Sequence, residues 1–120
     1  MRLFIPLIAW TLSGACLAAD APTAFPTKPL KIVVPFAAGG STDVMARLVG
    51  QKMAESLGQS VLIDNKPGAG GLIGNEQVVN SPKDGYTIGI STVSTMAVNP
   101  ACNPKLSYDP IKDFEPIGII

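Results

Sequence analysis

The chain has 120 residues, of which 47% are hydrophobic, and its nine basic side chains balance nine acidic ones. This balance gives no reason to expect binding to nucleic acid or to an anionic membrane surface. The sequence contains no histidine, so the commonest general base and metal ligand is absent. The length alone predicts one domain or less.

Residues 1–19 have the pattern of a signal peptide. A short positive start is followed by an almost wholly apolar run over residues 3–12 and then by small residues. Cleavage is expected after Ala18 or Ala19. A retained membrane anchor and a lipoprotein site at Cys16 are the alternatives. The sequence therefore predicts export, and a periplasmic location is the simplest reading.

Residues 20–29 have the composition of a short exported linker. After cleavage of the signal peptide, Cys102 is the one remaining thiol. A single thiol cannot form an internal disulfide, and a catalytic cysteine would need a histidine partner. Cys102 is therefore expected to be buried or merely tolerated.

The first strand and helix of the remaining chain are expected over residues 30–34 and about 42–57. Residues 30–34 are rich in β-branched side chains and nearly continuous in hydrophobicity, which is typical of a strand buried in a parallel sheet. Ser41 is the expected N-cap of the helix, and Gly58 is the residue expected to end it.

The expected helix has apolar side chains at every fourth residue, and these predict a stripe that faces the core. They are Met45, Val49, Met53 and Leu57. Arg47, Gln51 and Glu55 are expected on the opposite side of the helix.

The second half of the chain continues this alternation. Strands are expected over residues 61–63 and 86–90, with a short helix over 72–79 between them. The order strand, helix, strand, helix, strand predicts a doubly wound α/β fold with a parallel sheet. A further apolar run at 116–120 predicts one more strand. We therefore expect the chain to be part of a longer protein, with an edge strand that closes a small sheet as the alternative.

Three loops follow the expected strands, and each has a composition suited to a ligand. Two are the glycine-rich turns that contain Gly39-Gly40 and Gly68-Ala69-Gly70-Gly71, and the third is the hydroxyl-rich stretch 91–95. Loops after parallel strands meet at one edge of the sheet, where the first turn of a helix offers unpaired N–H groups to an anion. The candidate ligand-binding residues are Phe36, Gly39, Gly40, Ser41, Thr42, Asp43, Gly68, Ala69, Gly70, Gly71, Ser91, Thr92, Ser94 and Thr95.

Each of these candidates also has a purely structural interpretation. Glycine turns often serve packing alone, Ser41 could act only as a helix cap, and Phe36 could belong to the core. Asp43 could complement the helix dipole, fix the loop or accept a hydrogen bond from a ligand. A nucleotide site is disfavoured because Ile73 stands where a dinucleotide fingerprint that begins at Gly68 needs glycine.

Catalytic and metal sites have no support in the sequence. Asp64, Glu76 and Asp84 do not have the spacing of a paired acid–base site, and no cluster of metal-ligand residues is present. We therefore expect no catalytic residues, no bound metal and no cofactor. The rival hypotheses are a small exported enzyme that uses aspartate or tyrosine chemistry and an inert structural module.

Taken together, several short motifs resemble the periplasmic receptors of tripartite tricarboxylate transporters, also called Bug receptors. The motifs are Phe25-Pro26-Thr27-Lys28-Pro29, Ile32-Val33-Val34-Pro35-Phe36, Gly39-Gly40-Ser41-Thr42-Asp43, Leu57-Gly58-Gln59, Asn65-Lys66-Pro67-Gly68-Ala69-Gly70-Gly71, Asp84-Gly85-Tyr86-Thr87, Asn99-Pro100, Tyr108-Asp109-Pro110 and Lys112-Asp113-Phe114. The resemblance covers essentially all of the sequence after the signal peptide.

This resemblance implies a two-lobed binding protein of the type II periplasmic-binding-protein kind that closes on its ligand. It also implies a small carboxylate ligand, held by backbone amides and ordered waters in the glycine loops, and a membrane permease as partner. A complete member would have two lobes and roughly 300 residues. Residues 30–120 would then be the first part of lobe one, with lobe two absent. Cys102-Asn103 departs from the family pattern, away from the glycine loops.

Overall fold

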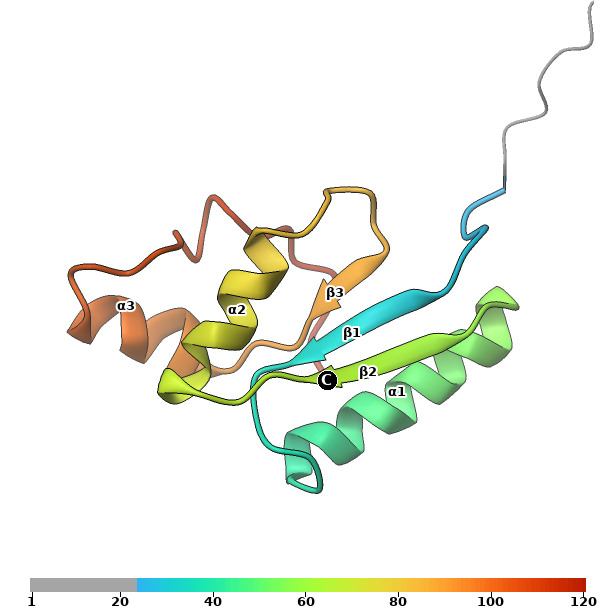
Figure 1. Cartoon of the computed structure of the whole chain (residues 1–120), viewed down its shortest axis with the longest axis horizontal. Helices are drawn as coiled ribbons and strands as arrows, with labels where there is room; N and C mark the ends of the chain where they lie inside the picture. Colours follow the sequence, from blue (N-terminus) through green and yellow to red (C-terminus); the bar gives the residue numbers. More distant parts are fainter. Residues whose placement is uncertain (1–23) are drawn as a thin grey trace, which may run out of the picture.

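The computed structural model describes residues 24–120, which are built around a three-stranded parallel sheet (Figure 1). The strands are β1 (Leu30–Val34), β2 (Val61–Asn65) and β3 (Thr87–Gly89), in the order β2-β1-β3. The central strand β1 is the most buried, because neighbours pair with it on both sides and helices cover both of its faces. The expected signal peptide and residues 20–23 of the expected linker lie outside the described residues.

Two helices cover opposite faces of the sheet. Helix α1 (Ser41–Leu57) packs on β1 and β2, and α2 (Leu72–Val79) packs on β1 and β3 (Figure 1). The chain moves from β1 to β2 in one direction and from β2 to β3 in the other. Right-handed crossovers therefore place the two helices on opposite faces. The expected doubly wound α/β fold is confirmed.

Short helical segments follow at the carboxyl ends of the strands. Residues Ala69–Gly71 form the 3₁₀ turn η1 directly before α2, while Ser94–Val98 form the π-helical turn η2, which runs into α3 (Asn99–Cys102). The α2 bounds agree with those expected from the sequence. Strand β2 is two residues longer than expected, and β3 is one residue shorter at each end.

The expected N-cap of α1 is wrong, and the expected core stripe is right only in part. The helix begins at Ser41, Gly40 occupies the N-cap position, and no side chain caps the helix there. Met45 and Leu57 of the expected stripe are 42% and 36% exposed. Val49 and Met53 are half-buried, and Met53 packs against the core. The buried positions of α1 are instead Asp43, Ala46 and Gly50.

Close packing explains why small residues occupy buried positions of α1 that the expected stripe does not include. A Cβ atom on Gly50 would lie 3.1 Å from Cδ1 of Ile63 on β2, so the helix approaches the sheet through side chains that are small. Apolar periodicity identifies the large apolar residues of the helix, whereas the closest contact between α1 and the sheet is made at small residues. The end of α1 was correctly predicted, because Gly58 adopts the left-handed conformation with φ 66°.

The strand expected at 116–120 is also wrong, because this segment contains no strand. Ile117 and Ile119 are 79% and 102% exposed. A strand needs a hydrogen-bonded neighbour as well as apolar side chains, and no strand among residues 24–120 pairs with this run. Cys102 is exposed, so of the two alternatives expected for it, burial is wrong.

No helix within residues 24–120 combines the length and hydropathy needed to cross a membrane.

Candidate functional site

The loops after β1, β2 and β3 leave the sheet at the same edge. Two backbone hydrogen bonds extend the ladders beyond the strands, from Lys66 N–H to the Val34 carbonyl at 2.8 Å and from Ile90 N–H to the Val33 carbonyl at 3.0 Å. The Asn99 side chain then donates to the Gly70 carbonyl at 3.1 Å. The three sequence-predicted loops are therefore neighbours in space.

The first loop is held by the buried carboxylate of Asp43, which is 3% exposed. Its Oδ2 accepts from Gly39 N–H and from Nε of Arg47, both at 2.9 Å, and its Oδ1 accepts from Nδ2 of Asn65 at 3.0 Å. The Asn65 amide also donates to the Phe36 carbonyl at 3.2 Å. This network joins both ends of the first loop to the end of β2. Both Asp43 oxygens are occupied, so its side chain fixes the loop.

Sequence reasoning did not assign Asn65 a role. It stands inside one of the family motifs, but nothing in its local pattern shows that its amide bridges two loops. The bridge arises from the register of β1 and β2, which pairs Val34 with Asn65. This pairing could be found only after the sheet had been assembled.

The donors around Asp43 hold its pKa well below the ordinary value. The hydrogen bond from Arg47 has the largest effect, followed by those from Gly39 N–H and Asn65, and together they lower the pKa from 3.8 to about 2. The folded-state pKa therefore lies below that of the unfolded chain. The stabilising contribution of Asp43 is present above the ordinary pKa and is lost as the pH falls towards 2.

This shift predicts how the first loop responds to acid. The Gly39 amide resonance should stay in place down to about pH 3 and then move as Asp43 binds a proton, with a midpoint near the pKa of about 2. Nuclear magnetic resonance of the chain during an acid titration would measure this midpoint. A midpoint at the ordinary aspartate value of 3.8 would contradict the hydrogen-bond network.

The first turn of α1 supplies the site's unpaired donors. The first backbone hydrogen bond of the helix runs from Val44 N–H to the Gly40 carbonyl at 3.0 Å. Ser41, Thr42 and Asp43 precede this bond, so their N–H groups have no partner within the helix. Gly39 N–H, in contrast, is already used by Asp43. Of the predicted donors in the first loop, Gly39 N–H is therefore engaged within the protein, whereas the N–H groups of the first helical turn are not bonded within the helix.

The second glycine turn is tight and packs against the other loops. Ala69, Gly70 and Gly71 all have positive φ, at 48°, 66° and 91°, as does Gly68 at 137°. Gly71 N–H donates to the Gly68 carbonyl at 2.9 Å. A Cβ atom on Gly71 would lie 2.5 Å from Thr95 Cγ2, so this glycine is needed for contact between the second and third loops.

The third loop is partly helical. Thr95 is fully buried, and its hydroxyl both accepts from Thr92 N–H and donates to the Thr92 carbonyl, each at 3.0 Å. The Thr92 and Ser94 hydroxyls lie 2.8 Å apart and share a hydrogen bond. Thr95 therefore builds the turn, while the hydroxyl-bearing members of this loop with some exposure to solvent are Ser91, Thr92 and Ser94.

Phe36 and Lys66 lie at the border of the site, and both side chains already have partners within the protein. The ring of Phe36 is half-buried and packs against the core of Ile32, Val34 and Ala46. The ammonium of Lys66 lies 3.4 Å from a carboxylate oxygen of Asp64. Phe36 thus belongs in part to the core, and the charge of Lys66 is partly neutralised.

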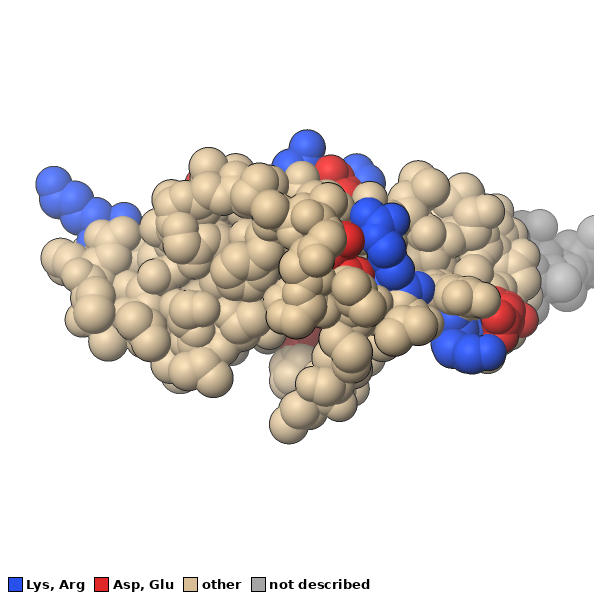
Figure 2. Space-filling view, turned by 90° about the horizontal axis from the view of Figure 1, so that it is seen from below, with Lys and Arg blue, Asp and Glu red and all other residues tan. Residues whose placement is uncertain are grey.

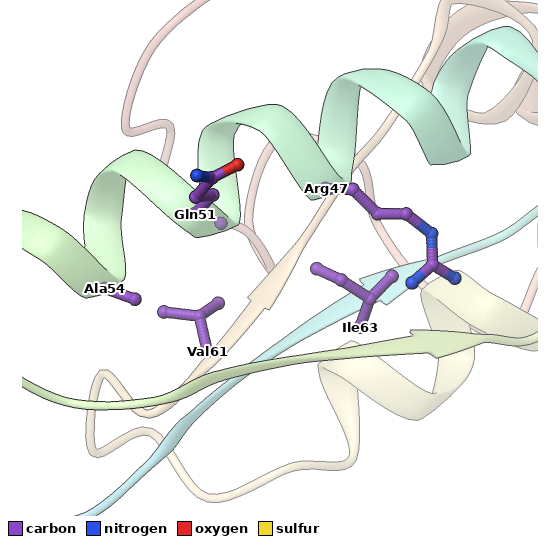
Figure 3. Close-up of a pocket in the computed structure, with 6 residues that line it drawn as sticks. Arg47, Gln51, Ala54, Val61 and Ile63 are labelled. Carbon is purple, nitrogen blue, oxygen red and sulfur yellow. The ribbon is translucent and has the colours of Figure 1, made fainter.

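A separate groove of about 260 Å³ lies between α1 and β2 (Figure 3). It is lined by Arg47, Gly50, Gln51, Ala54, Val61 and Ile63. None of the predicted ligand-binding residues lines it, and its one cation, Arg47, is paired with Asp43. On the face shown in Figure 2, acidic and basic groups are few and form no extended patch of one sign.

Comparison with known families identifies the chain. The family model of the tripartite tricarboxylate transporter family receptor matches residues 45–120, which are more than half of the sequence. The chain belongs to this family. BugT of Bordetella pertussis is 40% identical to this family member over 97 residues, which are 80% of this chain and 30% of BugT.

Solved structures of the family show the same fold. The periplasmic binding protein BugD matches with a TM-score of 0.74 and 42% identity, over 78% of this chain and 31% of BugD. MatC from Rhodopseudomonas palustris, solved with bound malate, matches with a TM-score of 0.71 and 43% identity, over 75% of this chain and 31% of MatC. The resemblance seen in the sequence motifs is confirmed, and these homologues are solute-binding receptors.

The chain spans about 30% of the length of the relatives that it matches. Its described part corresponds to a portion of a periplasmic-binding-protein lobe. The ligand and the partner of a complete receptor are therefore stated below as proposals.

Proposed function

We propose that the chain supplies one wall of a carboxylate site in a periplasmic receptor. The observation that carries this proposal is the start of α1, where three N–H groups without helical partners stand beside the other two loops at one edge of the sheet. The helix dipole adds positive potential at this point. The malate bound to MatC, a relative with 43% identity, supports a small carboxylate as the ligand.

Residues 30–120 act, in this proposal, as the first part of one lobe. The ligand bridges this wall and an opposing lobe, so binding shifts the receptor from open to closed conformers. A membrane permease of the tripartite tricarboxylate type receives the closed receptor. The role requires capture and release alone, and no residue of the chain acts as a catalyst.

The proposal can be tested by titrating the chain with malate while its backbone amide resonances are observed. Shifts are expected at Ser41, Thr42 and Asp43, with affinity in the millimolar range because only one wall is present. A neutral diol of equal length should cause no comparable shift. Micromolar affinity of the chain alone would contradict the need for an opposing lobe, and the absence of any shift would contradict the proposed site.

Two substitutions at Ser41 separate the backbone donor from the hydroxyl. Ser41→Pro removes the N–H at the first helical position, where proline is well tolerated, and Gly40 already has the extended conformation that a residue before proline prefers. Ser41→Ala removes only the hydroxyl. We expect Ser41→Pro to weaken malate binding at least roughly fivefold and Ser41→Ala to have little effect. Equal effects of the two changes would argue against capture by backbone amides.

A further inference from the structure

The hydroxyl of Tyr108 lies at the centre of a buried polar cluster that the proposed carboxylate site does not use directly. Tyr108 is 5% exposed, and its hydroxyl donates to the Thr95 carbonyl at 2.5 Å. The same hydroxyl accepts from Nδ2 of Asn75 at 3.3 Å, and Asn75 is 1% exposed. Tyr108 therefore connects α2, which carries Asn75, to the η2 turn, which carries Thr95.

Thr95 determines the shape of the third loop. Its hydroxyl bonds both the N–H and the carbonyl of Thr92, and its own N–H donates to the Thr92 carbonyl at 3.1 Å. Its methyl group packs on Gly71 in the second turn. A group that fixes the Thr95 carbonyl therefore fixes the Thr92–Thr95 turn and its contact with the second loop.

The segment that presents Tyr108 is itself ordered. The Asp109 carboxylate accepts from the N–H groups of Ile111 and Lys112 at 2.9 and 3.1 Å. Phe114 packs edge-on against the Tyr108 ring with centroids 5.5 Å apart. Ser107 donates to the carboxylate of Glu76 on α2. These contacts hold the Tyr108 side chain in one position, so it can act as a fixed support for the neighbouring loop.

We propose that Tyr108 is a positioning residue for carboxylate binding. Its hydroxyl, oriented by Asn75, holds the Thr92–Thr95 turn so that the third loop stands at the correct distance from the first two. The inference rests on the proposed function, because the third loop matters to affinity only if a ligand occupies the edge of the sheet. It assigns a role to the Tyr108-Asp109-Pro110 motif, which the proposed carboxylate site does not include.

The test compares Tyr108→Phe with Tyr86→Phe. The first change removes the hydroxyl and keeps the ring that packs on Phe114. The second removes a hydroxyl that accepts from Thr27 N–H at 2.8 Å, beside the start of β3 and away from the loops. Both variants are examined by amide hydrogen exchange without ligand and by malate titration of the chain.

In Tyr108→Phe, exchange at the Thr95 and Met96 amides should accelerate roughly fivefold to tenfold, the effect of one lost hydrogen bond. Amides of β1 should keep their rates, which shows that the fold is intact. Malate affinity should fall by a similar factor. Tyr86→Phe should change neither the η2 amides nor the affinity. Asn75→Leu should give a smaller acceleration, because the bond from Tyr108 to Thr95 remains.

Unchanged exchange at Thr95 and Met96 in Tyr108→Phe would overturn the positioning role. Faster exchange with unchanged malate affinity would also overturn it, since the tyrosine would then be purely structural. If the parent chain shows no malate-dependent shift at Ser41, Thr42 and Asp43, the proposed function fails. The exchange data still report separately on whether Tyr108 orders the loop.

Discussion

Replacing Gly74 with alanine should destabilise the fold by about 2 kcal/mol, although alanine is the better helix former. A Cβ atom at this position of α2 would lie 2.7 Å from both Cα and Cβ of Pro35 and 3.1 Å from the Lys66 carbonyl oxygen. Overpacking of this kind typically costs about 1–3 kcal/mol and sometimes more. The gain of about 1 kcal/mol in helix propensity offsets only part of it.

The position of Gly74 makes this clash hard to relieve. Pro35 directly follows the central strand and begins the first loop, while Lys66 begins the second, so α2 cannot move away without disturbing both. Thermal unfolding followed by circular dichroism should show a midpoint lower by on the order of 10 °C. The loop amides of Ser41 and Gly70 should shift even below the unfolding transition.

Gly50→Ala is the matched control, because Gly50 is also a buried helical glycine. Its added Cβ would meet the ends of two side chains, Cδ1 of Ile63 at 3.1 Å and Cγ1 of Val61 at 3.3 Å. Side-chain ends can yield where backbone atoms cannot. We expect Gly50→Ala to remain within about 1 kcal/mol of the parent. If the two variants were equally stable, the close approach of α2 to Pro35 would be contradicted.

Patterns that report on single elements predicted much of this fold. The β-branched run of β1 and the left-handed residue Gly58 each act locally, so the residues themselves reveal them. Glycine is a poor helix former, yet α2 contains Gly74, because this position lies too close to Pro35 for a side chain. Tertiary packing here outweighs intrinsic propensity.

Features that depend on contact between two distant segments could not be predicted from the sequence. The apolar residues of α1 recur every four positions, but the helix turns Ala46 and Gly50 towards the sheet, because small residues allow the closest approach. Asn65 bonds to Asp43, which is 22 residues away in the sequence. Tyr108 bonds to Thr95, which is 13 residues away. The common edge of the three loops was predictable because parallel strands impose it.

Replacing Asp43 with asparagine should release the first loop and weaken carboxylate binding at least roughly tenfold, because hydrogen bonds to a charged group are lost. Every partner of the carboxylate is a donor: Gly39 N–H and Arg47 on Oδ2, and Asn65 on Oδ1. An amide offers only one acceptor oxygen. Its NH₂ group must therefore face at least one of these donors in either orientation.

The loss should be seen first in the loop and only secondarily in the sheet. Exchange at the Gly39 amide should accelerate, and the acid titration with a midpoint near 2 should disappear from its resonance. Arg47 should lose its main partner, so the positive charge beside the groove between α1 and β2 becomes free. Affinity for malate falls because the N–H groups of Ser41 and Thr42 are no longer held in one orientation.

Asp84→Asn is the matched control for this change. The Asp84 carboxylate accepts from Tyr86 N–H and from Lys28, each at 3.0 Å, and its pKa is also lowered, chiefly by the Tyr86 N–H. Its surroundings are exposed, and it lies beside the start of β3, away from the loops. We expect it to leave malate affinity and the Gly39 amide unchanged. If Asp43→Asn behaved like Asp84→Asn in both measurements, the carboxylate would not be what holds the first loop, and the arrangement of donors at the start of α1 would need another cause.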